Sequence, residues 1–284
     1  MLGALIIVFR EAIEAGLIVG IVLAATKGVP RRGLWVACGV LSGALGACIV
    51  AAFAGRLAGL FQGTGQELFN ASVLALAVGM LTWHNVWMSA HGREIAAEMK
   101  HVGAAVASGE RTLTALAIVV GVAVLREGSE VVLFLYGIAS QGGTSNMALL
   151  AGGGLGLVAG ALVSALMYFG LLAIPTGRLF AVTSALITLL AAGMASQSVL
   201  FLQQGGYLDV LTTPVWDTSW LLPQEGPGVA GIVGRMLHTL IGYSDSPDGA
   251  QLIAYAGTVL AIGALMRVAG GHTHHRRTPV PRAA

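Results

Sequence analysis

The motif R-E-A-I-E occupies residues 10–14, and a second copy, R-E-G-S-E, occupies residues 126–130. Both copies lie inside long stretches made otherwise of Leu, Ile, Val, Ala and Gly. A charged side chain at the centre of a membrane helix costs at least ~2.5–3.5 kcal/mol, so three charges in one such helix indicate a function. On a helix the two glutamates of each motif share one face, and the arginine lies one turn before the second glutamate. We therefore take this repeated motif as the functional centre of the chain.

Two such helices that face each other would bring four carboxylates and two guanidinium groups together in a poorly hydrated place. This set is net negative and offers only hard oxygen ligands, which suit Fe³⁺, Fe²⁺ and Mn²⁺, whereas softer ions such as Cu⁺ prefer sulfur. The motif pair therefore predicts a cation site. Its charge balance leaves both divalent and trivalent ions open.

The composition predicts a helical membrane protein. Of the 284 residues, 56% are hydrophobic and only 10% are charged, whereas about a quarter are charged in an ordinary soluble domain. No polar stretch is long enough for a large soluble domain, and no basic stripe indicates nucleic acid as a partner. Each of seven apolar stretches approaches or exceeds the ~20 residues that span a hydrocarbon core. The expected fold is all-α, with seven transmembrane helices near residues 2–25, 33–54, 67–90, 112–139, 147–174, 178–202 and 251–268.

The positions of Lys and Arg predict the orientation of the chain in the membrane. Eleven of the 15 follow the first, third, fifth or seventh stretch, two lie on the opposite side, and two belong to the motifs. We therefore expect the N-terminus outside and the C-terminus in the cytoplasm.

The spacing of the motifs predicts an internal repeat. They lie 116 residues apart, in the first and fourth helices, so the second copy has to run inverted through the membrane. Inverted repeats with a polar site near the midplane are a common transporter plan. We divide the single transmembrane domain, residues 1–284, into a first three-helix repeat (1–110), a second (111–204), an outer loop (205–249), a seventh helix (250–270) and a cytoplasmic tail (271–284).

The third stretch contains a second candidate feature. Four of its side chains recur at four-residue spacing and so share one helix face: Met80, His84, Met88 and His91. They would be weak ligands along an exit path for a cation. We favour another interpretation, a helix end in the membrane interface, where Trp83 and Trp87 form an aromatic belt among polar residues.

Two smaller expectations concern the second stretch and the outer loop. We expect Cys38 and Cys48 to be buried thiols without a redox role. The sequence that begins at Val229 is typical of a short amphipathic helix lying in the membrane interface.

The paired motif, seven apolar helices and an outer N-terminus resemble the high-affinity, oxidase-dependent iron permease family, and most of all its bacterial elemental-iron uptake permeases. The resemblance covers nearly the whole chain. It implies a permease that imports iron, as Fe²⁺ or Fe³⁺, across the inner (cytoplasmic) membrane, with no permanently bound cofactor and no enzymatic activity. Further strings similar to bacterial members are Q-E-L-F from Gln66, L-T-W from Leu81, V-W-M from Val86 and I-G-Y from Ile241.

The resemblance also implies roles for particular residues. Iron would be bound along the path by Glu11, Glu14, Glu127 and Glu130, with Arg10 and Arg126 holding and partly neutralising these carboxylates. At the entrance, the resemblance indicates Glu67 and Gln204 as candidates. The four-residue spacing described above adds His84 and Met88 as candidate residues of the path.

Two departures from the bacterial relatives lie at the outer entrance. Asn70 replaces a glutamate that often follows Q-E-L-F, and Gln203 and Gln204 stand where relatives often carry His and Glu. Both departures remove charge. The resemblance further implies an extracytoplasmic iron-binding or iron-oxidising partner that meets the outer loop.

Other interpretations stay open from sequence alone. A permease for another divalent metal, such as lead or manganese, would use the same carboxylates. A membrane metalloenzyme would need histidine beside carboxylates at depth, yet the sequence puts His84 and His91 near the cytoplasmic end of their helix. Buried ion pairs that merely join helices are weak stabilisers, and an excess of carboxylates fits that role poorly.

Overall fold

The structure is a computed structural model, and it describes residues 1–59, 65–140, 145–170, 176–224 and 228–272. Within these ranges the chain forms helices and no β-strand, apart from one isolated bridge between Pro214 and Asp248. The helices are α1 (Leu2–Ala25), α2 (Arg32–Gly59), α3 (Gln66–Ala107), α4 (Thr114–Ser140), α5 (Asn146–Tyr168), α6 (Thr176–Gln204), α7 (Gly228–Ile241) and α8 (Gly249–His272).

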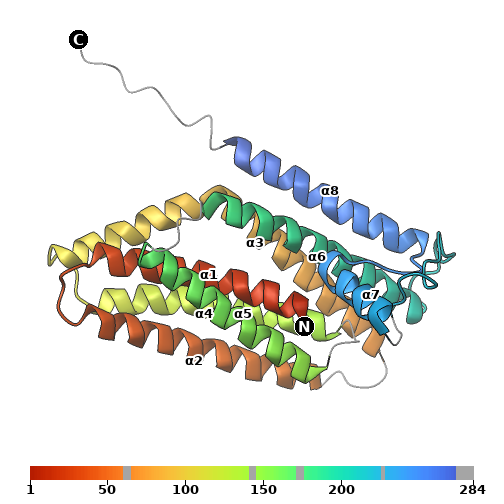
Figure 1. Cartoon of the computed structure of the whole chain (residues 1–284), viewed down its shortest axis with the longest axis horizontal. Helices are drawn as coiled ribbons and strands as arrows, with labels where there is room; N and C mark the ends of the chain where they lie inside the picture. Colours follow the sequence, from red (N-terminus) through yellow and green to blue (C-terminus); the bar gives the residue numbers. More distant parts are fainter. Residues whose placement is uncertain (60–64, 141–144, 171–175, 225–227, 273–284) are drawn as a thin grey trace, which may run out of the picture.

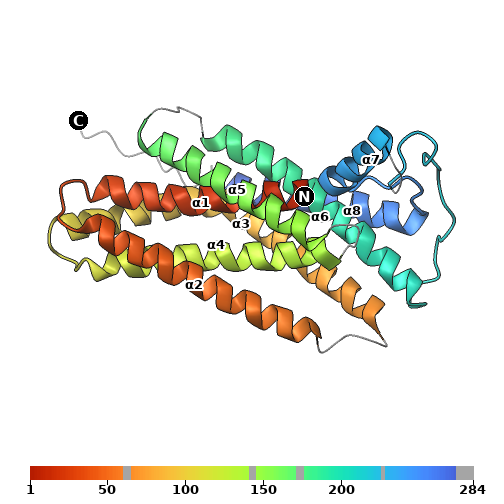
Figure 2. The same cartoon turned by 60° about the horizontal axis from the view of Figure 1, so that its bottom comes forward.

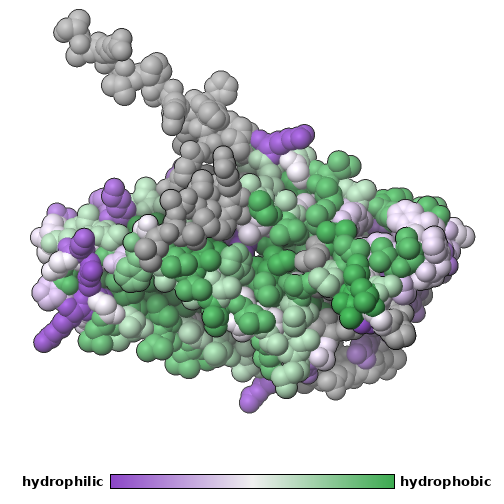
Figure 3. All heavy atoms as spheres, in the orientation of Figure 1, coloured by the Kyte–Doolittle hydropathy of each residue, from purple (hydrophilic) through white to green (hydrophobic). Residues whose placement is uncertain are grey.

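The long helices lie along a common axis and successive ones run in alternate directions, whereas α7 is short and lies at one end (Figure 1). Turning the molecule shows the same bundle, with α2 along one edge (Figure 2). Hydrophobic residues cover most of the face seen in Figure 3. These are the features of a protein whose surface faces lipid.

Within the described residues, five helices contain segments that are long and apolar enough to cross a membrane, so the chain is a multi-pass membrane protein. The helices α1 and α4, with 24 and 27 residues, fall within the range of lengths of the helices that contain these segments. They differ in that each carries the three charges of one motif. The five segments are Arg32–Ala54, Gln66–Met88, Asn146–Tyr168, Ala181–Gln204 and Gly249–Ala269.

The helices pair across the two halves of the chain. The most extensive packing joins α1 to α5, α2 to α4 and α3 to α6, while α8 lies against α6 and α3. Glycine permits two of these close approaches. A Cβ on Gly43 of α2 would lie 2.5 Å from the carbonyl oxygen of Gly121 in α4, and one on Gly160 of α5 would lie 2.7 Å from that of Phe9 in α1.

Two hydrophobic clusters flank the motifs along the helices. The larger includes Ile7 of α1, Leu81 of α3 and Phe134 of α4. The smaller includes Val22 of α1 and Val120 of α4. The charged motifs, at residues 10–14 and 126–130, lie between these clusters, so a polar layer is enclosed by apolar packing on both sides.

Several expected boundaries differ from the structure. The helix α3 continues to Ala107 instead of ending at residue 90, because the polar segment beyond the apolar one is rich in Ala, Glu, Met and Lys, which favour helix. Conversely, α5 ends at Tyr168, short of residue 174. The short helix expected from Val229 is confirmed as α7. Of the predicted tail, residues 273–284 lie outside the described part of the chain.

The prediction that the two cysteines are buried is wrong. Cys38 and Cys48 are both exposed. They belong to α2, which packs mainly on α4 and lies along one edge of the bundle, so the opposite side of α2 is left open.

Candidate metal-binding site

The first motif is fully enclosed. The side chains of Arg10, Glu11 and Glu14 are at most 2% exposed. Arg10 Nε lies 2.8 Å from Glu14 Oε1, one helical turn away, and Arg10 Nη1 lies 3.6 Å from Glu11 Oε1. The guanidinium group therefore contacts both carboxylates of its own motif, as the sequence pattern indicates.

The second motif repeats this arrangement on α4 at the edge of the polar layer. Arg126 Nε donates to Glu130 Oε1 at 3.2 Å and lies 3.8 Å from Glu127 Oε1. The Arg126 side chain is 36% exposed, and its guanidinium carbon lies 4.4 Å from the ring centroid of Trp87 on α3. A cation over an indole face is attracted to it. The aromatic ring thus supports the less enclosed of the two arginines.

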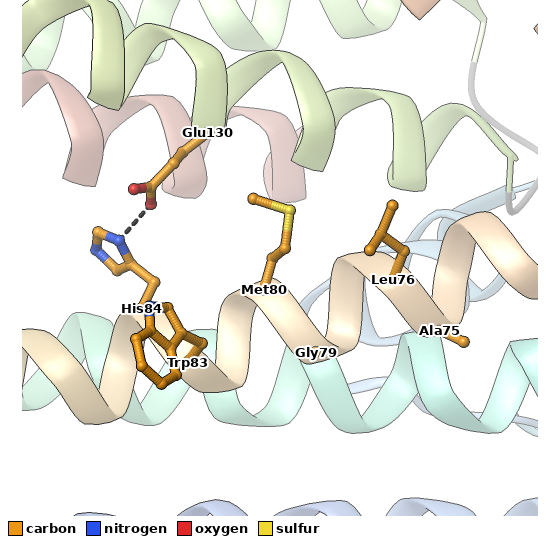
Figure 4. A pocket seen from close by; sticks show the side chains of 7 residues that line it. All are labelled: Ala75, Leu76, Gly79, Met80, Trp83, His84 and Glu130. Atoms are coloured by element: carbon orange, nitrogen blue, oxygen red, sulfur yellow. Dashed lines mark ion pairs between the residues drawn. The ribbon is translucent and has the colours of Figure 1, made fainter. Parts of the chain in front are cut away.

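His84 of α3 joins the two motifs. Its Nε2 lies 3.4 Å from Glu14 Oε2 and 4.0 Å from Glu11 Oε2, and its Nδ1 contacts Glu130 Oε2. Only 2% of the residue is exposed. Figure 4 shows His84 and Glu130 pointing toward one another. The favoured interpretation of this segment as an interfacial helix end is therefore wrong for His84, whereas the adjacent Trp83 does face outward and is 72% exposed.

One set of ligand atoms is compact enough to surround a single ion. Atoms of Glu11, His84, Glu127 and Glu130 all lie within 4.8 Å of one another. Glu14 borders this set through His84 and is held by Arg10. The structure thus brings the glutamates of both motifs to one place and adds a histidine to them.

The carboxylates of this site are short of hydrogen bonds. Among the described residues, both oxygens of Glu11 and of Glu14 and one oxygen each of Glu127 and Glu130 are buried without a hydrogen bond of good geometry, and several are held only by ion-pair contacts. Burying charged oxygens without full compensation costs several kcal/mol per ion. A bound cation would supply the missing interactions, so the arrangement suits metal binding better than it suits helix packing.

A hollow leads to the site along α3. A cavity of about 300 Å³ ends at His84 and Glu130 (Figure 4). A second cavity of about 270 Å³ shares Leu76 and Met80 with the first. It continues toward the N-terminal end of α3, where its other lining residues are Ala54, Phe69, Ser72, Val73, Ala77, Leu133 and Tyr136. The lining is mostly apolar until it reaches the two ionisable groups.

Only two of the four residues in the predicted stripe on α3 line this hollow. Met80 and His84 line it. Met88 is half-buried farther along α3. His91 is exposed, stacks on Trp87 with ring centroids 5.3 Å apart, and contacts the Trp87 carbonyl oxygen through Nδ1 at 3.2 Å. The stripe therefore divides into an inner half at the site and an outer half beyond it.

The predicted entrance residues lie at the end of the molecule where α3 begins and α6 ends. Glu67 and Gln204 are both exposed there. A Cβ on Gly205 would lie 3.3 Å from the Cβ of Glu67, and Ser198 Oγ donates to the Ala71 carbonyl oxygen at 2.9 Å, so the two helix ends are joined. Neither residue is among those that line the two cavities described above.

Sequence reasoning missed Asn85 as a residue that fixes α3 beside the site. Asn85 is 1% exposed. Its Nδ2 donates to Thr188 Oγ1 at 3.1 Å and to the Ser184 carbonyl oxygen at 3.3 Å, and its Oδ1 accepts from Ser184 Oγ. The signal available in the sequence was an amide inside an apolar helix, directly after His84. These bonds anchor the turn of α3 that carries the histidine.

Comparison with known proteins gives the family of the chain. Residues 1–272 match the family model described as the iron permease FTR1 family. The chain is 29% identical over 254 residues to the ferrous iron permease EfeU of Escherichia coli O6:K15:H31 (strain 536 / UPEC), which covers 88% of this chain and 89% of that protein. The protein of the same name from Yersinia pestis is 28% identical over 254 residues, with 88% and 87% covered. No solved structure matches the chain. Because the family match spans nearly all of it, the chain belongs to the iron permease FTR1 family.

Proposed function

We propose that this chain imports iron across the cytoplasmic membrane and binds the ion in passage at the glutamates of the two R-E-x-x-E motifs. Membership of an iron permease family makes the chain a transporter and not an enzyme, with iron as its substrate. The observation that carries the proposal is the gathering of buried carboxylates from both motifs, where ligand atoms of Glu11, Glu127 and Glu130 lie within 4.8 Å of one another. The ligands would be Glu11, Glu14, Glu127 and Glu130, with Arg10 and Arg126 reducing their mutual repulsion.

The proposal includes seven transmembrane helices, with α1 and α4 as the two that carry the motifs. Their lengths of 24 and 27 residues suffice to span the hydrocarbon core, and they run in opposite directions in the bundle (Figure 1). The excess of Lys and Arg after alternate helices supports an outer N-terminus and a cytoplasmic C-terminus. The enclosing hydrophobic clusters support a site near the middle of the membrane.

An inverted repeat of three helices is supported by the packing. If α1–α3 correspond to α4–α6, then the contact of α1 with α5 corresponds to that of α4 with α2, and both are extensive. The close-approach glycines agree, because Gly43 of α2 and Gly160 of α5 lie 117 residues apart, one more than the motifs. Each half would then supply one motif to the site at the interface of the repeats.

The ion that best fits the proposal is Fe²⁺. The choice follows from the relatives, which are named ferrous iron permeases. The excess of two negative charges that the motifs leave would accept a divalent or a trivalent ion. In reconstituted vesicles we expect uptake of Fe²⁺ to exceed that of lead, manganese or zinc supplied at the same concentration.

Two site variants test the proposal directly. Glu14→Ala and Glu130→Ala should each abolish iron uptake by vesicles while the protein remains inserted and folded, because each removes a carboxylate that the ion needs. Glu98→Ala, an exposed glutamate on the same α3 that carries His84, is the matched control and should transport normally. Retention of most uptake by both site variants would overturn the proposal.

We further propose that an extracytoplasmic iron-binding or iron-oxidising protein delivers iron to the loop between α6 and α8. This segment is folded: Gln224 Nε2 donates to the Tyr243 carbonyl oxygen at 2.7 Å, and the hydroxyls of Thr218 and Tyr243 lie 2.5 Å apart. Trp216 and Trp220 of this segment are exposed, and the exposed fraction of Trp220 is 80%. Aromatic side chains are enriched in protein interfaces. Full high-affinity uptake by vesicles that contain this chain alone would argue against a required partner.

A further inference from the structure

We propose that His84 is itself a metal ligand and that it gives the site its preference for Fe²⁺ and similar transition-metal ions over Mg²⁺ and Ca²⁺. The inference rests on the proposed function and changes the ligand set: one nitrogen from α3 joins carboxylates from α1 and α4. Neither the R-E-x-x-E motifs nor the names of the relatives assign a role to this residue.

The geometry supports one ion held by this mixed set. Metal–ligand distances are ~2.0–2.6 Å for nitrogen and oxygen donors, so donors on opposite sides of an ion lie ~4–5 Å apart. The ligand atoms of Glu11, His84, Glu127 and Glu130 satisfy this limit, since all lie within 4.8 Å of one another. The four residues come from three helices, and their atoms therefore enclose a point instead of lying along one helix face.

Burial gives a second, independent reason. Both ring nitrogens of His84 are buried, and each faces a carboxylate: Nε2 lies 3.4 Å from Glu14 Oε2, and Nδ1 contacts Glu130 Oε2. The side chain is directed into the polar layer, and the cavity beside α3 ends against it (Figure 4). A histidine whose ring lies among carboxylates of both motifs is placed where a cation bound by those carboxylates would meet it.

The chemistry of the donors determines what such a ligand would do. Sites built only of carboxylate, carbonyl and water oxygens suit Mg²⁺, Ca²⁺ and Mn²⁺. Imidazole suits Fe, Zn, Ni and Cu, so replacing one oxygen by a nitrogen shifts the preference away from the hard cations. The four glutamates alone would bind abundant hard cations well. His84 would therefore provide selectivity, while the carboxylates provide most of the attraction.

The position of His84 is fixed by its neighbour in the chain. Asn85 binds Ser184 and Thr188 of α6 on the other side of α3, which holds the turn that carries the histidine. Metal ligands need such support, because misplacement of a ligand weakens binding. His91, farther along the same helix, has no comparable role, since it is exposed and stacked on Trp87.

The test compares His84→Gln and His84→Cys with the control His91→Gln. Gln offers an oxygen donor without adding charge, and Cys offers a soft donor. Uptake of Fe²⁺ by reconstituted vesicles would be measured with an excess of Mg²⁺, Ca²⁺ or Zn²⁺ as competitor, and binding of each ion alone to the purified protein by calorimetry. Thermal unfolding of each variant would show that it is folded.

We expect Mg²⁺ and Ca²⁺ to leave uptake by the wild type and by His91→Gln unchanged. In His84→Gln the affinity for Fe²⁺ should fall ~10–100-fold, as for loss of a metal-site interaction, and Mg²⁺ and Ca²⁺ should now inhibit. His84→Cys should still exclude the hard cations and become more sensitive to Zn²⁺, because thiolate is a softer ligand.

Two results would overturn the inference. One is unchanged competition by Mg²⁺ and Ca²⁺ in His84→Gln. The other is an identical response of the Gln and Cys variants, which would mean that the histidine only holds the carboxylates in place. Either result leaves the proposed function intact if Glu14→Ala and Glu130→Ala still abolish uptake. Retained uptake in those two variants would instead count against the proposed function itself.

Discussion

The close contact between α5 and α1 makes the site sensitive to a single methyl group. In Gly160→Ala the new Cβ would lie 2.7 Å from the Phe9 carbonyl oxygen and 2.6 Å from the Cβ of Ala12. Ordinary contacts begin near 3.4 Å, so α1 and α5 have to separate by about 0.7 Å. Phe9 directly precedes Arg10, and Ala12 lies within the motif, so the separation occurs at the ligands themselves.

The expected loss follows from that displacement. Overpacking of this kind typically costs ~1–3 kcal/mol. Because a 1 Å misplacement in a functional site can lower a rate ~100-fold, a shift of about 0.7 Å should reduce iron uptake ~10-fold or more. The measurements are initial uptake rates in reconstituted vesicles and thermal unfolding of the purified protein in detergent.

Gly154→Ala is the control for this prediction. It lies on the same helix, is exposed, and a Cβ there would have no atom within 4 Å. It should unfold and transport as the wild type does. If Gly160→Ala transports at the rate of Gly154→Ala, the approach of α5 to α1 does not position the ligands, and the reasoning from the glycine contact is refuted.

Three further predictions concern the arginine, the hollow and the outer entrance. Arg10→Lys keeps the charge but loses the planar group that contacts two carboxylates, so uptake should fall several-fold, and uptake at the wild-type rate would show that this geometry is irrelevant. Gly79→Leu should fill the cavity that ends at the site and lower uptake without loss of thermal stability, because a Cβ there has no atom within 4 Å. The control is Gly257→Leu on α8, which is equally open but remote from the cavity and should transport normally. Equal uptake rates for the two variants would exclude the cavity as the route of the ion. Asn70→Glu combined with Gln204→Glu should lower the apparent KM for iron a few-fold at low salt and leave the maximum rate unchanged, and the gain should disappear at high ionic strength because the added charges act through solvent. No change in KM at any salt concentration would indicate that iron is loaded by another route, such as direct transfer from a docked partner.

Hydropathy predicted the helices well because it measures the property that determines them. The structure places α1 at Leu2–Ala25, the range that the first apolar stretch predicts, and α4 and α6 begin and end within a few residues of the predicted positions. It failed beyond the membrane, where α3 continues through Glu94, Glu98 and Lys100. That part is polar, and its helical state depends on intrinsic propensity, which a search for apolar stretches ignores.

The site was predictable where the sequence repeats and unpredictable where it does not. Two copies of one motif indicated four glutamates and two arginines as candidates. The structure places Glu11, Glu127 and Glu130 within 4.8 Å of one another and Glu14 beside His84. His84 has no counterpart in a second motif, and it follows Trp83 near the predicted end of an apolar stretch. Trp83 faces outward and His84 inward, so adjacent positions have opposite environments. The four-residue spacing of Met80 and His84 was the available signal, and the choice between the two faces of the helix required tertiary structure.

The packing of helices from the first half of the chain against helices from the second half limits the order in which the protein can fold during synthesis. When the ribosome has completed α1 and α2, their main packing partners α5 and α4 have not yet been synthesised. The first motif can therefore contact the second only after residues 126–130 have been synthesised. A chain that stops after α3 lacks α4 and α5, the helices against which α2 and α1 pack. A chain that ends before α4 therefore lacks Glu127 and Glu130, two of the four residues that form the candidate site.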